Sequence, residues 1–217
     1  FSAVATNLEY GVVEYLHGNI EGVHSIAMGR YLQQGVEKLE ALEVDEKYAT
    51  EKAQLIEGLT SELAENMQTD PDIYDIFIIC PEGKITVSTL KSEIGADKSS
   101  DVFFTEGSKG LFIKSIYHSV TGKITLSFAA PILQENTKKL LGVVVERCEP
   151  KHFNEILADS TGLGNTGETY LVDKDGYMIS PSRFEKDVIL KQKVETEPVK
   201  LYQAQKKDMV GIYKDYR

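Results

Sequence analysis

The sequence lacks any apolar run approaching the roughly 18 residues that a membrane-spanning helix needs. It also begins with Phe1 rather than Met, so we expect an excised part of a longer protein, and any membrane anchor would lie outside the given residues. Basic residues are scarce, because 24 Lys and Arg stand against 34 Asp and Glu, a formal net charge of −10. This excess of acid argues against nucleic acid or an anionic membrane surface as a partner.

Metal-binding patterns are also missing. The two cysteines, Cys80 and Cys148, have no metal-site spacing, and each ends an apolar run of strand type. A disulfide between them requires the two strands to be neighbours, and two partly buried free thiols are the alternative. His17 and His24 share a helix face, but no carboxylate or cysteine completes a metal set at a usable spacing. We therefore expect no metal site.

Catalytic and cofactor signals are equally weak. No Ser or Cys lies in a nucleophile-elbow sequence, and no carboxylate pair has the context of a general acid and base. Gly162, Gly164 and Gly167 spell G-x-G-x-x-G, but a helix-like segment precedes them and a strand-like segment follows, the reverse of a dinucleotide-binding unit. We predict no catalytic residues, no enzymatic activity and no cofactor in this part of the protein.

A long helical stripe opens the chain. Residues 1–40 carry apolar side chains at steps of three or four, which predicts one helix of about 60 Å that glycines such as Gly29 weaken locally. A second helical stretch covers residues 46–68. Beyond it the period becomes strand-like, in the segments 73–80, 84–89, 110–119, 122–133 and 138–148. These segments predict an antiparallel sheet with one face open for a pocket.

An internal repeat divides the chain. The segment FIICPEGKITVS, residues 77–88, can be laid over YLVDKDGYMISP, residues 170–181, with Gly83 on Gly176. Each copy follows a helix, so we expect two modules of one kind. The second copy has less chain after its glycine, which predicts that its last strands are missing and that residues 211–217 begin its third strand.

The sequence combines the long N-terminal helix and the tandem modules with the strand SFAAPI and the segment TGETYLVDKDGYMISPSRF. In these features the chain resembles the double Cache, or double PDC, sensor domain. The resemblance implies an α+β fold, in which a long N-terminal helix precedes two PAS-like modules with antiparallel sheets, the second one incomplete at its C-terminus. It implies helices over residues 1–70, a membrane-distal module over 71–149 and a truncated membrane-proximal module over 150–217.

The function that the resemblance implies is extracytoplasmic sensing. Such a domain binds a small molecule in its distal module and passes a conformational change across the membrane, and the present motifs are most like those of sensor histidine kinases. The family pattern further implies a homodimer through the N-terminal helix, membrane segments outside this chain and a kinase in a separate cytoplasmic domain. A chemoreceptor sensor domain, a surface enzyme and a ligand-free spacer on the same modules are the alternatives.

The family's amino-acid signature has Arg-x-Trp-Tyr/Phe before the third strand and Tyr-x-Asp on that strand. Asp101 replaces the carboxylate-binding Arg and His118 replaces the amine-binding Asp, which disfavours an amino-acid ligand but keeps the place of the pocket. Core packing is the alternative for the two phenylalanines, an exposed strand end for His118 and a salt bridge for Arg147. The expected ligand-binding residues are Phe103, Phe104, Lys114, Ile116, His118, Ser127, Ala129 and Arg147.

Overall fold

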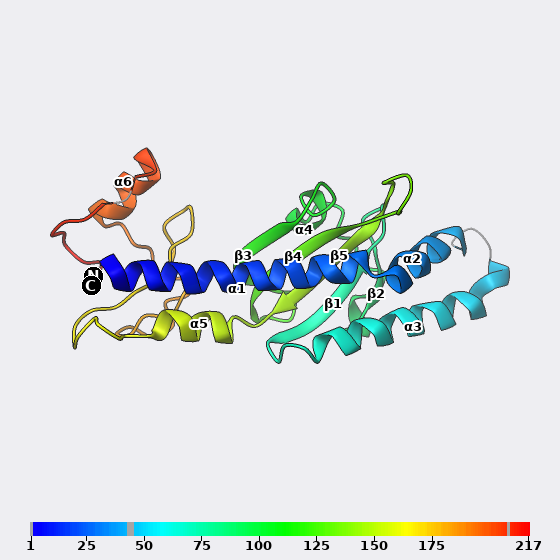
Figure 1. Cartoon of the computed structure of the whole chain (residues 1–217), viewed down its shortest axis with the longest axis horizontal. Helices are drawn as coiled ribbons and strands as arrows, with labels where there is room; N and C mark the ends of the chain where they lie inside the picture. Colours follow the sequence, from blue (N-terminus) through cyan, green and yellow to red (C-terminus); the bar gives the residue numbers. More distant parts are fainter. Residues whose placement is uncertain (1, 43–45, 208) are drawn as a thin grey trace. The chain divides into compact units, whose positions relative to one another are not determined.

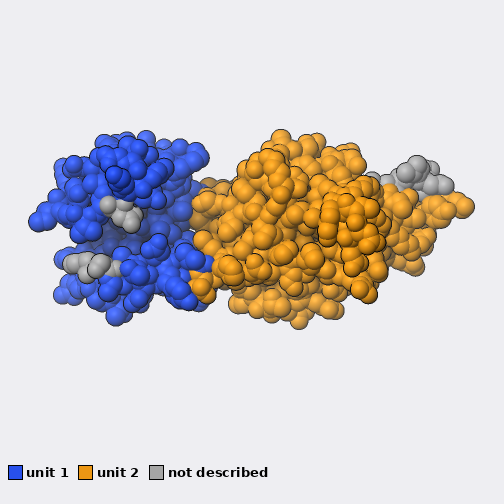
Figure 2. All heavy atoms as spheres, turned by 45° about the horizontal axis from the view of Figure 1, so that its top comes forward, with its two compact units in different colours: residues 1–13, 151–217 blue, residues 14–150 orange. Residues whose placement is uncertain are grey.

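The computed structural model describes residues 2–42, 46–207 and 209–217. The chain forms two compact units, drawn in different colours in Figure 2. Unit 2 comprises Glu14–Pro150, and unit 1 combines Phe1–Val13 with Lys151–Arg217. The boundary between the units therefore falls once inside the first helix and once just before residue 151.

The predicted N-terminal helix is interrupted at Gly29. Helix α1 covers Ser2–Met28 and α2 covers Arg30–Leu42. At the break, the N–H of Gly29 donates to the carbonyl of Ile26, three residues back, at 3.0 Å. Glycine has the lowest helix propensity after proline, so the break lies where the helix is intrinsically weakest. The second predicted helix is confirmed as α3 (Ala49–Met67), after the short helix η1 (Glu46–Tyr48).

All five predicted strands are confirmed in unit 2, and they form one antiparallel sheet in the order β2-β1-β5-β4-β3 (Figure 1). The central strand β5 and its neighbour β1 are almost completely buried, since both faces of the sheet are covered. The strands are β1 (Ile73–Ile79), β2 (Ile85–Ser88), β3 (Phe112–His118), β4 (Ile124–Leu133) and β5 (Leu140–Cys148).

One face of the sheet is covered by the connection between β2 and β3, which contains η2 (Lys91–Glu93) and α4 (Val102–Thr105). Side chains from this connection and from the sheet form one apolar cluster: Phe77, Ile79, Ile85, Phe103, Ala129, Val143 and Val145. We call this side the site face. Alternation along β5 places Glu146 and Cys148 on the opposite side, which we call the helix face.

Cys80 and Cys148 are free and buried. Their strands are indeed neighbours, but β1 and β5 are antiparallel, and Cys148 pairs with Ile73 at the far end of β1. The two thiols therefore lie at opposite ends of the strand pair, and the alternative of two free thiols is confirmed. Burial raises the pKa of both thiols.

Unit 1 contains α5 (Lys151–Ala158), α6 (Glu197–Gln205) and a small apolar cluster around Met178, Val188 and Val194. The strand-like segment after the glycines forms only isolated bridges, Val172 to Met178 and Tyr177 to Lys193. Residues 211–217, predicted to begin a third strand, carry no strand, and Ile212 is fully exposed. A strand persists only beside a ladder partner, and this segment has none among the described residues.

The two segments of the internal repeat form matching turns. In the first copy the N–H of Cys80 donates to the carbonyl of Lys84, and Gly83 has a φ of 85°. At the equivalent positions of the second copy, Asp173 donates to the carbonyl of Tyr177, and Gly176 has a φ of 88°. Positive φ at this position requires glycine, which explains the shared residue.

The loop that contains Gly162, Gly164 and Gly167 follows α5, as predicted. It offers carbonyl groups rather than N–H groups to the side chain of Arg183. Nη1 of Arg183 donates to the carbonyl oxygens of Gly164 and Gly167 at 2.8 and 2.9 Å. A phosphate loop needs free N–H donors, so this loop is organised around a cation of the chain itself. None of the described helices combines the length and the apolar character needed to cross a bilayer.

Candidate functional site

The centre of the site face is a buried ion pair. Nη1 of Arg147, on β5, lies 2.9 Å from Oδ2 of Asp75, on the neighbouring strand β1, and both side chains are almost fully buried. The guanidinium also stacks over the ring of Phe77 at 4.4 Å from the ring centroid. The register that pairs Asp75 with Arg147 brings these side chains together. The salt bridge expected for Arg147 is therefore confirmed.

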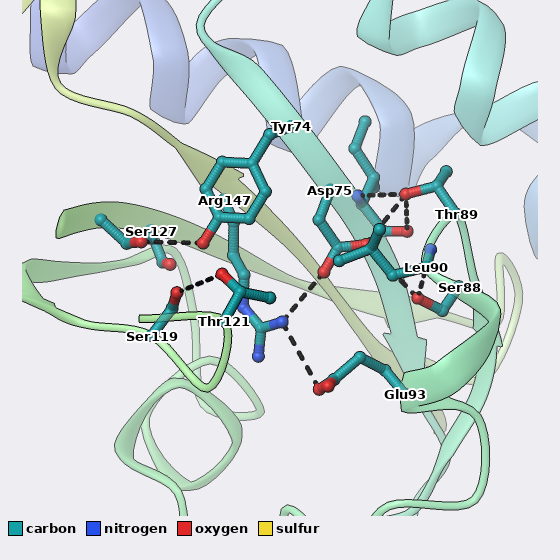
Figure 3. A network of polar contacts seen from close by, with 12 residues as sticks. Tyr74, Asp75, Ser88, Thr89, Leu90, Glu93, Ser119, Thr121, Ser127 and Arg147 are labelled. Atoms are coloured by element: carbon teal, nitrogen blue, oxygen red, sulfur yellow. Dashed lines mark hydrogen bonds and ion pairs between the residues drawn. The ribbon is translucent and has the colours of Figure 1, made fainter. Parts of the chain in front are cut away.

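Hydroxyl groups hold the Asp75 carboxylate from the β2 side. The hydroxyls of Thr89 and Ser88 donate to its Oδ1 at 2.9 and 3.3 Å (Figure 3). Burial raises the pKa of Asp75, while the hydrogen bond from Thr89 and the charge of Arg147 oppose that shift. A carboxylate with two hydroxyl donors and a guanidinium partner is suited to remain ionised in this buried position.

Glu93 brings a second acid to the guanidinium. Its Oε2 lies 3.5 Å from Nη1 of Arg147, and Figure 3 shows both carboxylates directed at the same guanidinium. Neither this Oε2 nor Nε of Arg147 has a hydrogen-bond partner among the residues that the structure describes, although both atoms are buried. Buried polar atoms are nearly always hydrogen-bonded, so the pair presents one donor and one acceptor for a further group.

Two lysines surround Asp101, at the start of α4. Its carboxylate oxygens lie 3.8 Å from Nζ of Lys114 and 3.7 Å from Nζ of Lys98. The Lys114 ammonium also lies over the rings of Phe103 and Tyr117, at 4.8 and 4.0 Å from their centroids. Burial lowers the pKa of Lys114, and the charge of Asp101 counters this effect. The aromatic faces and the carboxylate stabilise the cation in a half-buried position.

Tyrosine and hydroxyl side chains border the ion pair toward the β3 edge. The hydroxyl of Tyr117 lies 2.8 Å from that of Ser127, and the hydroxyl of Tyr74 lies 2.7 Å from that of Thr125. Burial raises the pKa of Tyr117, so its phenol is neutral at physiological pH and can both donate and accept. The site face thus has an apolar half under α4 and a polar half that contains both acidic and basic side chains.

Most of the residues expected to bind a ligand do lie together. Lys114, Ser127, Ala129 and Arg147 all belong to the site face, because the register pairs Lys114 with Ser127 and Ser127 with Arg147. Phe103 is fully buried in the apolar cluster, and Phe104 packs against the same cluster. Core packing, the alternative stated for the two phenylalanines, therefore describes their contacts.

Ile116 and His118 are expected in the ligand-binding site together with Lys114, but the structure does not place them on the same face of the sheet. The pairing of β3 with β4 shifts between Lys114 and Tyr117, so a bulge interrupts the alternation. The contacts of Tyr117 with Ser127 and Lys114 place Tyr117 on the site face, and its neighbours on either side point the other way. His118 is exposed, which matches the alternative of a histidine at a strand end.

Sequence reasoning missed five polar members of the site: Tyr74, Asp75, Glu93, Lys98 and Tyr117. Asp75 had a visible signal, since it is the one charged residue within the apolar run IYDIFII. Glu93 and Lys98 lie in the long connection between β2 and β3, where no periodicity indicates which side chains turn inward.

No family model and no curated protein matches the chain. Among solved structures, the sensor domain of the V. cholerae histidine kinase DctB superimposes with a TM-score of 0.67 at 13% identity, over 94% of this chain and 73% of that one. The sensory domain of the Campylobacter jejuni chemoreceptor Tlp3 with isoleucine bound gives a TM-score of 0.62 at 14% identity, over 94% and 79% of the two chains.

The ligand-binding domain of the Pseudomonas aeruginosa PAO1 amino-acid chemoreceptor PctC, in complex with GABA, gives a TM-score of 0.54 at 15% identity. That match covers 97% of this chain and 81% of the PctC chain. At such identities the likeness is one of fold. The chain therefore has the fold of the Cache-type sensor domains of histidine kinases and chemoreceptors.

Proposed function

We propose that this chain is the extracytoplasmic sensor domain of a transmembrane receptor, a sensor histidine kinase, and that it binds a small molecule on the site face of unit 2. The fold supports this assignment, since the solved structures that share it are sensor domains. The function itself is argued from the side chains of the site face, because a fold alone does not define a ligand.

The observation that carries the proposal is the buried cluster of charge around Arg147. Three cations and three acids gather on one sheet face under η2 and α4: Lys98, Lys114, Arg147, Asp75, Glu93 and Asp101. A cluster of this kind is costly to bury, and well-packed apolar residues would stabilise the sheet as well or better. Its retention in the centre of a sensor fold favours a binding role.

The ligand that fits this cluster is small and polar, and it carries both hydrogen-bond donors and hydrogen-bond acceptors. Nε of Arg147 and the ammonium of Lys114 favour an acceptor or an anion, whereas Oε2 of Glu93 favours a donor. We propose Lys114, Ser127, Ala129 and Arg147 as contact residues, together with Glu93 and Tyr117, whereas Phe103 belongs to the apolar cluster of this face and Phe104 packs against it. Ile116 and His118 are left out because the bulge in β3 turns them away.

A thermal-shift screen of the chain against organic acids, amino acids, amines and nucleobases tests the proposal. A ligand at about 100 times its dissociation constant should raise the free energy of unfolding by roughly 2.7 kcal/mol. Lys114→Gln should weaken the binding of a hit at least tenfold, or by about 1.4 kcal/mol. His118→Ala, a matched change on the same strand, should leave the affinity unchanged, and a hit that is lost in His118→Ala but kept in Lys114→Gln would contradict the site.

We further propose a homodimer through the N-terminal helix, with membrane segments outside the present chain. Large apolar side chains are exposed on α1, with Tyr10 67% and Val13 53% accessible. A helix that presents apolar side chains to solvent is suited to contact a second copy, and membrane anchoring raises the effective concentration of the partner.

A further inference from the structure

A cavity lies on the helix face of unit 2, away from the site face. It has a volume of about 310 Å³ and is enclosed by α1, the end of α3 with its following turn, and the strands β1 and β5. Gly18 and Gly22 form its α1 wall, Asp70 lies in the turn, and Glu146 comes from β5. Glu146 and Arg147 are successive residues of one strand, so this cavity and the site face lie on opposite sides of the sheet.

Glu146 is an acid with little to compensate its charge. Its side chain lines the cavity, yet the residue is only 3% exposed. Within the described residues its carboxyl accepts a hydrogen bond from Sγ of Cys148 alone, at 3.3 Å, and a thiol is a weak donor. No Lys, Arg or His is among the residues that line this cavity. A buried carboxylate without a cation is costly, and it favours a positively charged occupant.

The two asparagines of the cavity each use one amide N–H in a bond to the backbone of their own helix. Nδ2 of Asn19 donates to the carbonyl of Tyr15 at 2.8 Å, and Nδ2 of Asn66 donates to the carbonyl of Glu62 at 2.9 Å. The amide oxygen of each asparagine therefore remains for an incoming N–H or O–H group. Asp70 adds a second carboxylate, of which Oδ1 accepts one bond from the N–H of Asp72.

The wall formed by α1 leaves room for an occupant. A Cβ atom added at Gly18 or at Gly22 would meet nothing within 4 Å, so these glycines are not required by close packing of the helix. Within the described part of the chain, no group of three or more His, Cys, Asp or Glu side chains could hold a metal ion. Two carboxylates and two amide oxygens around a space of this size match an organic cation that donates several hydrogen bonds.

We propose that this cavity is a second ligand site, specific for a small primary ammonium ion. The ammonium would form an ion pair with Glu146, and its remaining N–H groups would donate to the amide oxygens of Asn19 and Asn66. Asp70 would add to the negative potential near the rim. This site is independent of the function proposed for the site face, since the two share no side chain.

Binding at this site must depend on pH, because Glu146 has to be ionised to pair with the cation. Burial raises the pKa of Glu146 to about 7, the hydrogen bond from Cys148 opposes that shift and the charge of Asp70 adds to it. Among the described residues, the phenol of Tyr15, the thiol of Cys148 and the carboxyl of Asp72 also interact with this group of acids, and burial raises the pKa of Tyr15 and of Cys148. All of these groups are acidic, so affinity for the ammonium should increase as the pH rises through 7.

Isothermal titration of the whole chain with propylammonium at pH 8 tests the proposal, and tetramethylammonium serves as a cation of like charge that cannot donate. Propylammonium should bind and tetramethylammonium should bind at least tenfold more weakly. Glu146→Gln should reduce the affinity for propylammonium at least tenfold. Gly22→Leu, which fills the cavity and raises helix propensity, should abolish binding while the circular dichroism of the chain is unchanged.

Asp101→Asn, on the site face, serves as the control and should leave the affinity for propylammonium unchanged. Equal affinity for the two cations, or binding that survives both Glu146→Gln and Gly22→Leu, would overturn the proposal. Loss of binding in Asp101→Asn with no loss in Glu146→Gln would place the ammonium on the site face and would overturn it equally.

Discussion

At the scale of single residues, the pair of Asp75 and Arg147 should be sensitive to the loss of either partner. Both side chains are almost fully buried and lie 2.9 Å apart. Asp75→Ala would leave the guanidinium buried without its main partner, so we expect a loss of about 3–5 kcal/mol in the free energy of unfolding. Urea denaturation measures this change. Lys193→Ala, which removes an exposed ion pair with Glu195, should have no measurable effect.

Glu146 should give the stability a distinctive pH dependence. Its pKa in the folded chain is about 7, above the ordinary value of 4.5, so the folded chain binds the proton more tightly than the unfolded chain does. The contribution of Glu146 to the free energy of unfolding is therefore largest below pH 4.5 and falls as the pH rises from there to 7. The contribution of Glu146 to the free energy of unfolding is at most about 3 kcal/mol.

The difference between the chain and Glu146→Gln isolates this contribution from the other acids. Urea denaturation of both proteins at pH 5 and pH 8 should show a larger loss of stability at pH 8 for the unchanged chain than for the variant. Parallel losses in the two proteins would show that Glu146 keeps an ordinary pKa in the folded state.

At the scale of secondary-structure elements, α4 lies close against the sheet because residue 107 is glycine. A Cβ atom there would lie 2.2 Å from the carbonyl oxygen of Phe103 and 2.9 Å from Cβ of Ala129. Gly107→Ala should therefore push α4 away from the sheet and destabilise the chain by about 1–3 kcal/mol.

Thermal denaturation checks this expectation, with Gly110→Ala as the matched control. A Cβ atom at Gly110 meets nothing within 4 Å, so this change should be neutral or slightly stabilising. A similar melting temperature for both variants would mean that α4 tolerates displacement, and that Gly107 does not fix its distance from the sheet.

The secondary-structure elements also show how far the sequence could be interpreted. The five strands of unit 2 were predictable, because apolar runs end at turn residues such as Gly83 and Gly122, both with positive φ. The bulge in β3 was not, since every residue of Phe112–His118 is compatible with a regular strand and only the pairing with β4 reveals the shift. Because of this bulge, the candidate site contains Tyr117 and does not contain Ile116 and His118.

The helix break at Gly29 and the absence of a sheet among the described residues of unit 1 were not predicted, for two different reasons. Gly29 was identified as a weak point, but whether a glycine ends a helix depends on packing that the sequence does not contain. In unit 1 the turn around Gly176 was predictable, whereas its flanking residues need ladder partners that the described chain does not supply.

At the scale of the whole molecule, the proposed dimer can be tested by cross-linking. Cys80 and Cys148 are buried, so a cysteine introduced on the surface is the reactive one. Val13→Cys on α1 should form a disulfide-linked dimer on mild oxidation of the membrane-anchored protein, as judged by non-reducing electrophoresis. Val120→Cys, in an equally exposed turn between β3 and β4, should remain monomeric, and equal cross-linking at both positions would contradict a specific contact through α1.

The central claim, that the site face of unit 2 binds the ligand, is tested most directly by hydrogen exchange of the whole chain with and without a saturating ligand from the thermal-shift screen. A bound ligand should order the connection between β2 and β3, and this should slow hydrogen exchange in residues 91–105 and along β3. The account predicts protection concentrated in these segments. Protection confined to residues 151–217, with the site face unchanged, would contradict it.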